Sequence, residues 1–301
     1  MAQQAKLSKI EFQRKFSTDE SCEKQLFQMK WPNGYRCEKC GCEHHSTIKT
    51  RNLPLYQCTE CGYQASAIVN TIFEKTRTPL SKWFIAVHGM ATDKRGYSAT
   101  QLAKDIEVSY PTAWLMLHKI REAMGSQDKK YDLSGIVEMD ESYFGGSDEN
   151  GKRGRGTEKT KVLVGLSLDE NGHPGFAKME VIDDVKGKTI LDFAQRNITS
   201  GSKINSDAFR SYNVLAKEYQ HESKVFDPIE DPDHLKWLHV ILSNAKAFVQ
   251  GTFHGLDEKH LQRYLKEFCY RFSRRQFEGQ GFFRLLNSCA SSKTITYNEL
   301  T

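Results

Sequence analysis

The second half of the chain alternates between hydrophobic and polar positions in a way that predicts a β-sheet with helices between its later strands. In residues 135–144, Ile136, Glu138 and Asp140 share one strand face, because successive side chains point to opposite faces. The expected elements are, in order, strands 135–144, 161–168 and 175–182, helix 189–197, strand 203–206, helix 213–219, strand 223–226 and helix 234–250. This order predicts an α/β fold, a mixed sheet flanked by helices.

The first 130 residues follow a helical pattern, in which apolar positions recur every three or four residues. Residues 8–30 predict two short packing helices. Residues 78–124 predict a helix, a break, a short helix, a turn and a longer helix that begins at Tyr110. The last three elements are typical of a helix-turn-helix motif, in which Ser109, Tyr110 and Thr112 face a DNA groove. A plain helical bundle explains the same pattern.

Four of the eight cysteines form two C-x-x-C pairs, Cys37 with Cys40 and Cys58 with Cys61, and 17 residues separate the pairs. This spacing is typical of a zinc ribbon with four thiolate ligands. A glycine directly follows each pair, as a tight turn favours. The sequence therefore predicts one structural Zn²⁺ ion. Alternative ligands lie nearby at less regular spacing: Cys42, His44 and His45.

The net charge is modest, with 43 Lys and Arg against 38 Asp and Glu. Its positive part is concentrated in residues 1–135, which hold 20 basic and 14 acidic side chains. This balance permits a polyanionic partner. No apolar run is long enough for a membrane span, and the polar first 16 residues lack the apolar region of a signal peptide. We therefore expect a cytoplasmic protein without a membrane partner.

Two aspartates stand at predicted strand ends, Asp140 on the first strand and Asp207 directly after the fourth. Bringing such carboxylates together is costly without a cation, because like charges repel and burial removes their hydration. Magnesium binds through few protein oxygens and keeps positions for water and phosphate, and a two-metal centre supports phosphoryl transfer. The pattern predicts Mg²⁺ or Mn²⁺ held by Asp140 and Asp207. Capping of local backbone is the structural alternative.

The last predicted helix carries polar side chains on two sides. At about 100° per residue, one polar face consists of His239, Ser243, Lys246 and Gln250. Asn244 lies on another flank among bulky apolar side chains, where an amide needs an inward partner. It either serves the structure or offers its oxygen to a metal. Lys246 lies about 160° from Asn244, so we expect it to meet a phosphate rather than the same metal.

Two basic segments are candidates for contact with a DNA backbone. The glycine-rich loop 151–156 is one, although a solvated turn explains it nearly as well. Residues 263–275 interleave basic and aromatic side chains, and an amphipathic packing helix explains that pattern. The residues expected at DNA are Ser109, Tyr110, Thr112, Lys119, Arg153, Arg155 and Lys246.

Several long motifs resemble those of one group of proteins. They are WPNGYRCEKCG, QCTECGYQAS, NTIFEKTRTPLSKWF, YPTAWLMLHKIREAM, VEMDESYFGG, NSDAFRSY, and SNAKAFVQGTFHG followed by HLQRYLKEFCYRFSRR. From about residue 12 to residue 290, the chain resembles bacterial insertion-sequence transposases that join an N-terminal zinc ribbon to an RNase H-like catalytic core. This group is related to the eukaryotic Merlin elements.

The resemblance implies a DDE-type mechanism whose third acidic member can be Asn, and hence Asp140, Asp207 and Asn244 as catalytic residues and metal ligands. Many relatives in the wider superfamily have a basic residue seven positions after the third member, where this chain has Gly251. The implied reaction is magnesium-dependent hydrolysis at the ends of the element, after which the freed 3′-hydroxyl attacks target DNA. Recognition of terminal inverted repeats falls to the ribbon and the helix-turn-helix. Pairing of two ends implies a homodimer or a larger assembly.

These patterns divide the chain into five expected segments: an N-terminal helical segment (1–34), a zinc ribbon (35–70), a helix-turn-helix region (71–130), an RNase H-like core (131–255) and a C-terminal helical extension (256–301). The leading hypothesis is an active transposase. A non-catalytic or domesticated DNA-binding regulator is the alternative. The paired carboxylates argue against a regulator, which has no use for them.

Overall fold

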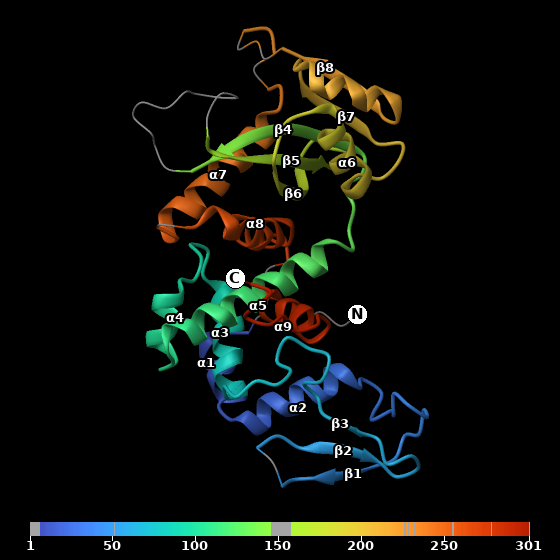
Figure 1. The fold of residues 1–301 in the computed structure, drawn as a ribbon, viewed down its shortest axis with the longest axis vertical. Coiled ribbons are helices and arrows are strands. Elements are labelled where there is room, and N and C mark those ends of the chain that lie inside the picture. The colour runs from blue at the N-terminus through green and yellow to red at the C-terminus, as the bar shows by residue number, and fades with distance from the viewer. Residues whose placement is uncertain are drawn as a thin grey trace. The chain divides into compact units, whose positions relative to one another are not determined.

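Figure 1 shows the fold of the protein as a computed structural model. The structure describes residues 7–50, 52–145, 158–225, 227, 229–231, 233–254, 256–277 and 279–300. The chain forms two compact units. The first consists of the chain up to Ser126 together with the chain from Phe277 onward, and the second consists of Gln127–Gln276. In the part of the chain that the structure describes, no helix has both the length and the apolar composition needed to cross a bilayer.

The first unit combines a small sheet with helices. Its elements are α1 (Lys9–Lys15), α2 (Asp19–Lys30), β1 (His45–Ile48), β2 (Leu55–Cys58), β3 (Gln64–Ala65), α3 (Leu80–Thr92), α4 (Ala99–Asp105), α5 (Tyr110–Asp128) and α9 (Gly281–Ala290). Ser8 and Thr18 begin α1 and α2 with capping boxes, which satisfy backbone N–H groups of the first turn. The rings of Phe12 and Phe16 pack against Phe282 of α9, with centroids 5.2 and 5.4 Å apart.

The second unit is built on a five-stranded mixed sheet. Its elements are β4 (Ile136–Phe144), β5 (Thr160–Leu168), β6 (Pro174–Ile182), α6 (Gly187–Asn197), β7 (Lys203–Asp207), the 3-10 helix η2 (Arg210–Lys217), β8 (Gln220–Lys224), α7 (Lys236–Thr252) and α8 (Glu258–Ser273). The strand order is β6-β5-β4-β7-β8, in which β5 is antiparallel to both neighbours and β4, β7 and β8 are parallel. This is the order expected of an RNase H-like core, so the predicted fold class is confirmed.

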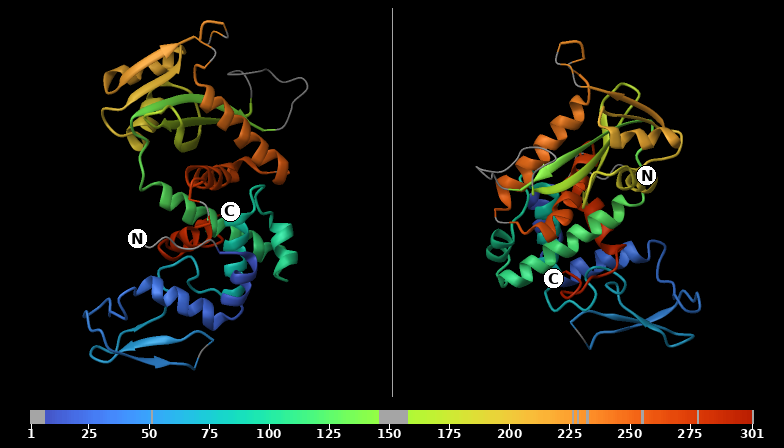
Figure 2. Two further views of the ribbon diagram at one scale, coloured as in Figure 1. Left: turned by 180° about the vertical axis from the view of Figure 1, so that it is seen from behind. Right: turned by 45° about the horizontal axis from the view of Figure 1, so that its top comes forward.

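Helices cover both faces of this sheet (Figures 1 and 2). α6 and η2 pack on the face that presents Val137 and Met139. α7 and α8 pack on the other face, which presents Val164 and Leu166. Because side chains alternate along β4, Asp140 points to the face that α7 covers.

The two edges of the sheet differ in what covers them. Side chains of α8 bind the outer backbone of β6. Gln262 accepts a hydrogen bond from the Val181 N–H at 2.7 Å and donates one to the Met179 carbonyl at 3.0 Å. The Ser273 hydroxyl accepts one from the Ala177 N–H at 3.1 Å. At the opposite edge, no strand lies beyond β8 among the described residues.

Most expected elements are observed with shifted ends. The strand expected at 223–226 is β8 at Gln220–Lys224, and the helix expected at 213–219 is η2 at Arg210–Lys217. β8 is rich in charge and has no apolar alternation, so its position is set by pairing with β7 rather than by its own pattern. The expected extension 256–301 is divided, because α8 lies in the second unit and α9 in the first.

Candidate active site

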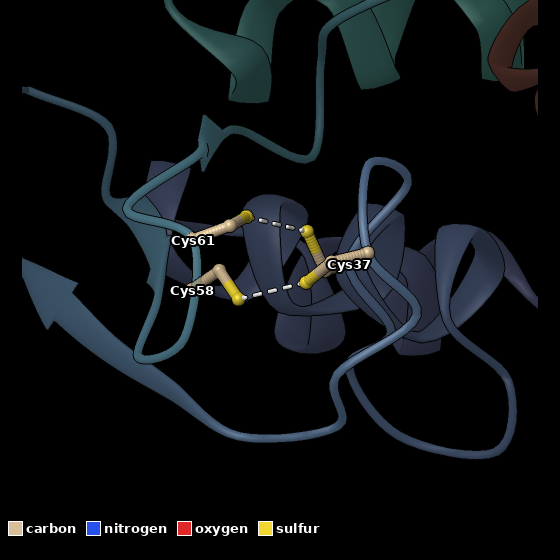
Figure 3. A group of neighbouring side chains, drawn as sticks. Cys37, Cys58 and Cys61 are labelled. Atoms are coloured by element: carbon tan, nitrogen blue, oxygen red, sulfur yellow. Dashed lines mark hydrogen bonds between the residues drawn. The ribbon is translucent and has the colours of Figure 1, made fainter.

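The four predicted zinc ligands come together in the first unit (Figure 3). Their sulfur atoms all lie within 4.8 Å of one another. Cys37 and Cys61 are 3.6 Å apart at sulfur, and Cys40 and Cys58 are 3.5 Å apart. A tetrahedral zinc ion with Zn–S bonds of about 2.3 Å needs sulfurs about 3.8 Å apart. The donor set and its spacing therefore fit zinc.

Local backbone geometry explains why these pairs converge. The glycine after each pair has a positive φ, 78° at Gly41 and 68° at Gly62, which closes the turn without Cβ strain. Each glycine N–H donates to the carbonyl of the first cysteine of its pair, at 2.9 and 3.1 Å. Cys42, an alternative ligand by sequence, lies outside the cluster, with its sulfur 3.7 Å from the His44 carbonyl oxygen.

The two aspartates predicted to bind metal occupy neighbouring positions of parallel strands. β4 and β7 pair as far as Met139 with Ser206, so Asp140 and Asp207 are the next residues on the two strands. Both point to the face covered by α7, because Met139 points to the other face. Adjacent strands lie about 4.8 Å apart. The sheet therefore brings these two carboxylates to one place.

Each carboxylate also caps local backbone. Asp140 Oδ1 accepts from the Glu141 N–H at 2.8 Å, and Asp207 Oδ1 accepts from the Phe209 N–H at 3.1 Å. These bonds orient the carboxylate of Asp140 in the middle of β4 and that of Asp207 at the end of β7. The pKa of Tyr212 is raised mainly by burial, and further by the carboxylates of Glu141, Asp140 and Asp207. Negative charge is concentrated at this point of the sheet, which is the condition that a cation relieves.

One face of α7 meets the Asp140 carboxylate. His239 Nε2 lies 3.7 Å from Asp140 Oδ2, and the side chains are 49% and 18% exposed. Interaction with Asp140 is the largest cause that raises the pKa of His239. Lys246 follows seven residues later, about 20° away around the helix, with Nζ 5.9 Å from the Phe144 ring centroid. Burial, and then Lys159, lower the pKa of Lys246, while Asp140 acts to raise it.

Asn244 lies elsewhere on the same helix. It is separated from His239 by about 140° and from Lys246 by about 160°, and its side chain is exposed. Strand register thus makes Asp140 and Asp207 neighbours, whereas Asn244 lies on a different side of α7 from His239, and its role stays a prediction. The sequence reasoning missed His239, and the signal that identifies it is the polar face it shares with Lys246, which is the face that turns toward the carboxylates.

Glu138 fixes the start of α7 relative to β4. It is buried, and its Oε2 accepts from the Leu238 N–H at 3.0 Å. Leu238 is in the first turn of α7, where backbone N–H groups have no acceptor within the helix. The N-cap residue, Leu235, provides no side-chain hydrogen bond to them. Burial raises the pKa of Glu138, and the hydrogen bond from Leu238 opposes that effect. Because Leu238 and His239 are consecutive, this bond positions His239 beside Asp140.

The residues predicted to read DNA have different surroundings. Ser109 is exposed at the start of α5 and bonds the Thr112 hydroxyl at 2.9 Å, and Tyr110 is 55% exposed. This exposure is what base reading by a helix N-terminus requires. Lys119 instead donates to the Thr294 hydroxyl at 2.8 Å, and burial lowers its pKa. Those contacts direct its ammonium group into its own unit. Arg153 and Arg155 lie outside the described residues.

The basic segment 263–275 is largely engaged within its own unit. Arg271 donates to Glu267 at 3.0 Å, and Arg274 donates to Asp128. Arg275 bonds the Gly175 carbonyl at the edge of β6. These contacts favour the interpretation of α8 as an amphipathic packing helix.

Two family models match the segments of the chain that hold these residues. An ISXO2-like transposase domain matches residues 132–273, which hold the aspartates, and a transposase zinc-ribbon domain matches residues 17–64, which hold the cysteines. In these two segments the chain is similar to ISXO2-like transposases, with a transposase zinc-ribbon domain followed by an ISXO2-like transposase domain.

Two curated proteins and a solved structure are similar to this chain. An uncharacterized protein in the transposable element ISH50 of Halobacterium salinarum is 25% identical over 240 residues, with 76% of each chain covered. An uncharacterized transposase-like protein of Haemophilus influenzae is 29% identical over 105 residues, which are 33% of this chain and 83% of that protein. A solved structure, the Mos1 mariner paired end complex with Mn, covers 69% of this chain and 78% of its own at 13% identity and a TM-score of 0.26.

Proposed function

We propose that this transposase catalyses divalent-metal-dependent cleavage and transfer of DNA strands at the ends of a transposable element. The observation that carries the proposal is the pair of carboxylates, Asp140 and Asp207, at neighbouring positions of the parallel strands β4 and β7. A regulator without catalysis has no need to hold two such groups together against their repulsion. The sequence resemblance implies Asn244 as the third member, and this residue lies about 140° around α7 from His239.

Individual residues of the chain would have distinct roles in such a reaction. Asp140 and Asp207 would hold Mg²⁺ or Mn²⁺, which supplies Lewis-acid activation of the attacking oxygen and stabilisation of the leaving oxygen. Lys246, on the same side of α7 as His239, would meet a phosphate of the DNA. Glu138 holds α7 in register with β4. The terminal inverted repeats would be contacted by Ser109 and Thr112 through their hydroxyl groups and by Tyr110 through its ring.

The proposed oligomeric state follows from the need to bind two DNA ends. Joining two ends of one element requires two copies of the end-binding surface, so we propose that the active form is at least a homodimer on DNA. The zinc ribbon, with its closed set of four thiolates, serves structure and DNA binding rather than catalysis.

The test uses the full-length zinc-loaded protein and duplexes that carry the sequences flanking its gene. Asp140→Ala and Asp207→Ala should each abolish Mn²⁺- or Mg²⁺-dependent cleavage while binding to the duplex is unchanged. Asp192→Ala, an exposed position on α6, is the matched control and should cleave normally. Normal cleavage by either metal-site variant would refute the assignment. No cleavage by the unaltered protein, together with specific binding, would favour the regulator.

A further inference from the structure

The backbone pairing that joins the strands of the two aspartates ends just before them. β4 and β7 are paired up to Met139 and Ser206. Asp140 and Asp207 are the next residues, and each is paired with the strand on its other side, β5 for Asp140 and β8 for Asp207. The ladder between β4 and β7 therefore does not by itself set the separation of the two carboxylates.

A side-chain hydrogen bond connects the same two parts of the chain just past that point. The Tyr212 hydroxyl, in η2, donates to Glu141 Oε2 at 3.1 Å. Glu141 directly follows Asp140, and Tyr212 lies five residues after Asp207, in the segment that leads from β7 to β8. The bond therefore ties β4 to the chain that leaves β7.

Burial makes this connection restrictive. No part of the Tyr212 surface is exposed, and its ring packs in the same core cluster as Val137 and Met139. Glu141 is also buried, and a buried carboxylate is costly unless it accepts hydrogen bonds. The raised pKa of Tyr212 keeps its hydroxyl protonated, so that it can donate. A hydrogen bond to an ionised acceptor is about twice as strong as a neutral one.

We propose that Tyr212 and Glu141 are positioning residues that set the separation of the Asp140 and Asp207 carboxylates from the opposite face of the sheet. The proposal rests on the proposed function, because it concerns the same two aspartates. Glu141 shares its face of β4 with Met139, so it acts through the backbone of β4 and of the turn after β7. Reacting groups misplaced by about 1 Å can lose about 100-fold in rate.

The first test removes the Tyr212 hydroxyl and keeps its ring. In the full-length zinc-loaded protein, Tyr212→Phe should lower the cleavage rate at saturating DNA and Mn²⁺ by at least about tenfold. The DNA concentration that gives half of the maximal rate should stay the same. Without DNA, Mn²⁺ binding measured by electron paramagnetic resonance of the unbound ion should weaken by about tenfold or more. The zinc ribbon stays loaded because its thiolates disfavour Mn²⁺.

Tyr219→Phe is the matched control for this variant. Tyr219 lies in the same unit, and its hydroxyl donates to the Ile198 carbonyl at 3.4 Å rather than to β4. The control should change neither cleavage nor Mn²⁺ binding. Glu141→Gln keeps an oxygen acceptor for the Tyr212 hydroxyl, so it should cleave nearly as the unaltered protein does.

A double variant separates positioning from stability. Tyr212→Phe leaves the buried Glu141 carboxylate without one donor, so it should also lower the urea midpoint of the second unit. Tyr212→Phe combined with Glu141→Leu removes both polar partners and should recover most of that stability. Its cleavage and Mn²⁺ binding should nevertheless stay as low as in Tyr212→Phe, because the tie between β4 and η2 is still missing.

The outcomes distinguish this inference from the proposed function. Normal cleavage and Mn²⁺ binding in Tyr212→Phe, or recovery of both together with stability in the double variant, would overturn the inference. If Asp140→Ala and Asp207→Ala are inactive while Tyr212→Phe is normal, the positioning role fails alone. If the two aspartate variants cleave and bind Mn²⁺ normally, the proposed function fails as well.

Discussion

The hydrogen bond from the Leu238 N–H to Glu138 makes a quantitative prediction about how α7 is attached to the sheet. Replacing Glu138 by Ala leaves a buried N–H without its acceptor, which costs about 1–3 kcal/mol. It also removes a negative charge from the N-terminus of α7, worth about 0.3–1 kcal/mol. We expect Glu138→Ala to lower the free energy of unfolding of the second unit by about 2–3 kcal/mol. Glu138→Gln keeps an oxygen acceptor and should lose less than about 1 kcal/mol.

Hydrogen exchange measured by mass spectrometry can localise this effect. The amide of Leu238 should exchange at least about 30-fold faster in Glu138→Ala, because 2 kcal/mol corresponds to that factor. Trp237, the one tryptophan among residues 127–276, provides a fluorescence signal at the same turn during urea unfolding. Glu222→Ala is the matched control, because its ion pairs with Lys203 and Lys224 are partly exposed and contribute little.

The stabilities of the two Glu138 variants, compared with each other, test this reasoning. If Glu138→Ala and Glu138→Gln lose equal stability, the acceptor oxygen is not what matters. If exchange at Leu238 is unchanged in Glu138→Ala, the start of α7 is held by its apolar contacts alone. Either result would refute the reasoning that Glu138 positions His239.

Two further predictions concern zinc and pH. Metal analysis of reduced protein should find one zinc per chain, Cys58→Ser should lose it, and Cys42→Ser should keep it; a zinc content unaffected by Cys58→Ser would contradict the four-cysteine site. Burial raises the pKa of Asp128 from 3.8 to about 6 even though Arg274 opposes the shift. The folded state therefore binds this proton more tightly, so the stabilisation is complete below about pH 4 and is lost as pH rises to about 6. Urea unfolding of Asp128→Asn at pH 4, 5 and 6.5 should lack that decline, and a slope identical to that of the unaltered protein would contradict the burial argument.

The sheet could be predicted from the sequence because its central strands carry their own patterns. Residues 136–144 and 160–168 are apolar enough that the order of elements followed from periodicity. The neighbouring positions of Asp140 and Asp207 depend on the register of β4 with β7. The bounds of β8 were predicted less accurately than those of the central strands. An edge strand with exposed, charged side chains takes its register from the neighbouring strand and not from its own sequence pattern. The division of the C-terminal segment between two units depends on tertiary packing that periodicity does not encode.

The third member of the site shows a different limit. Helical geometry puts His239 and Lys246 on one polar face and Asn244 on another, but geometry alone does not say which face turns toward the sheet. In the structure His239 lies beside Asp140, and the role of Asn244, which the resemblance implies, stays a prediction. The missing information was the Glu138 bond, a contact between residues 100 positions apart in the chain.

The unequal edges of the catalytic sheet have a consequence for how this protein misassembles. Gln262 and Ser273 occupy the backbone groups of β6 that an intruding polypeptide would need, whereas the described residues place nothing comparable along β8. Intermolecular strand addition is thereby confined to the β8 edge, where the charged side chains of Glu222 and Lys224 discourage it. Preparations that precipitate should accordingly be rescued by added charge or proline on the outer side of β8, and not by changes at the opposite border.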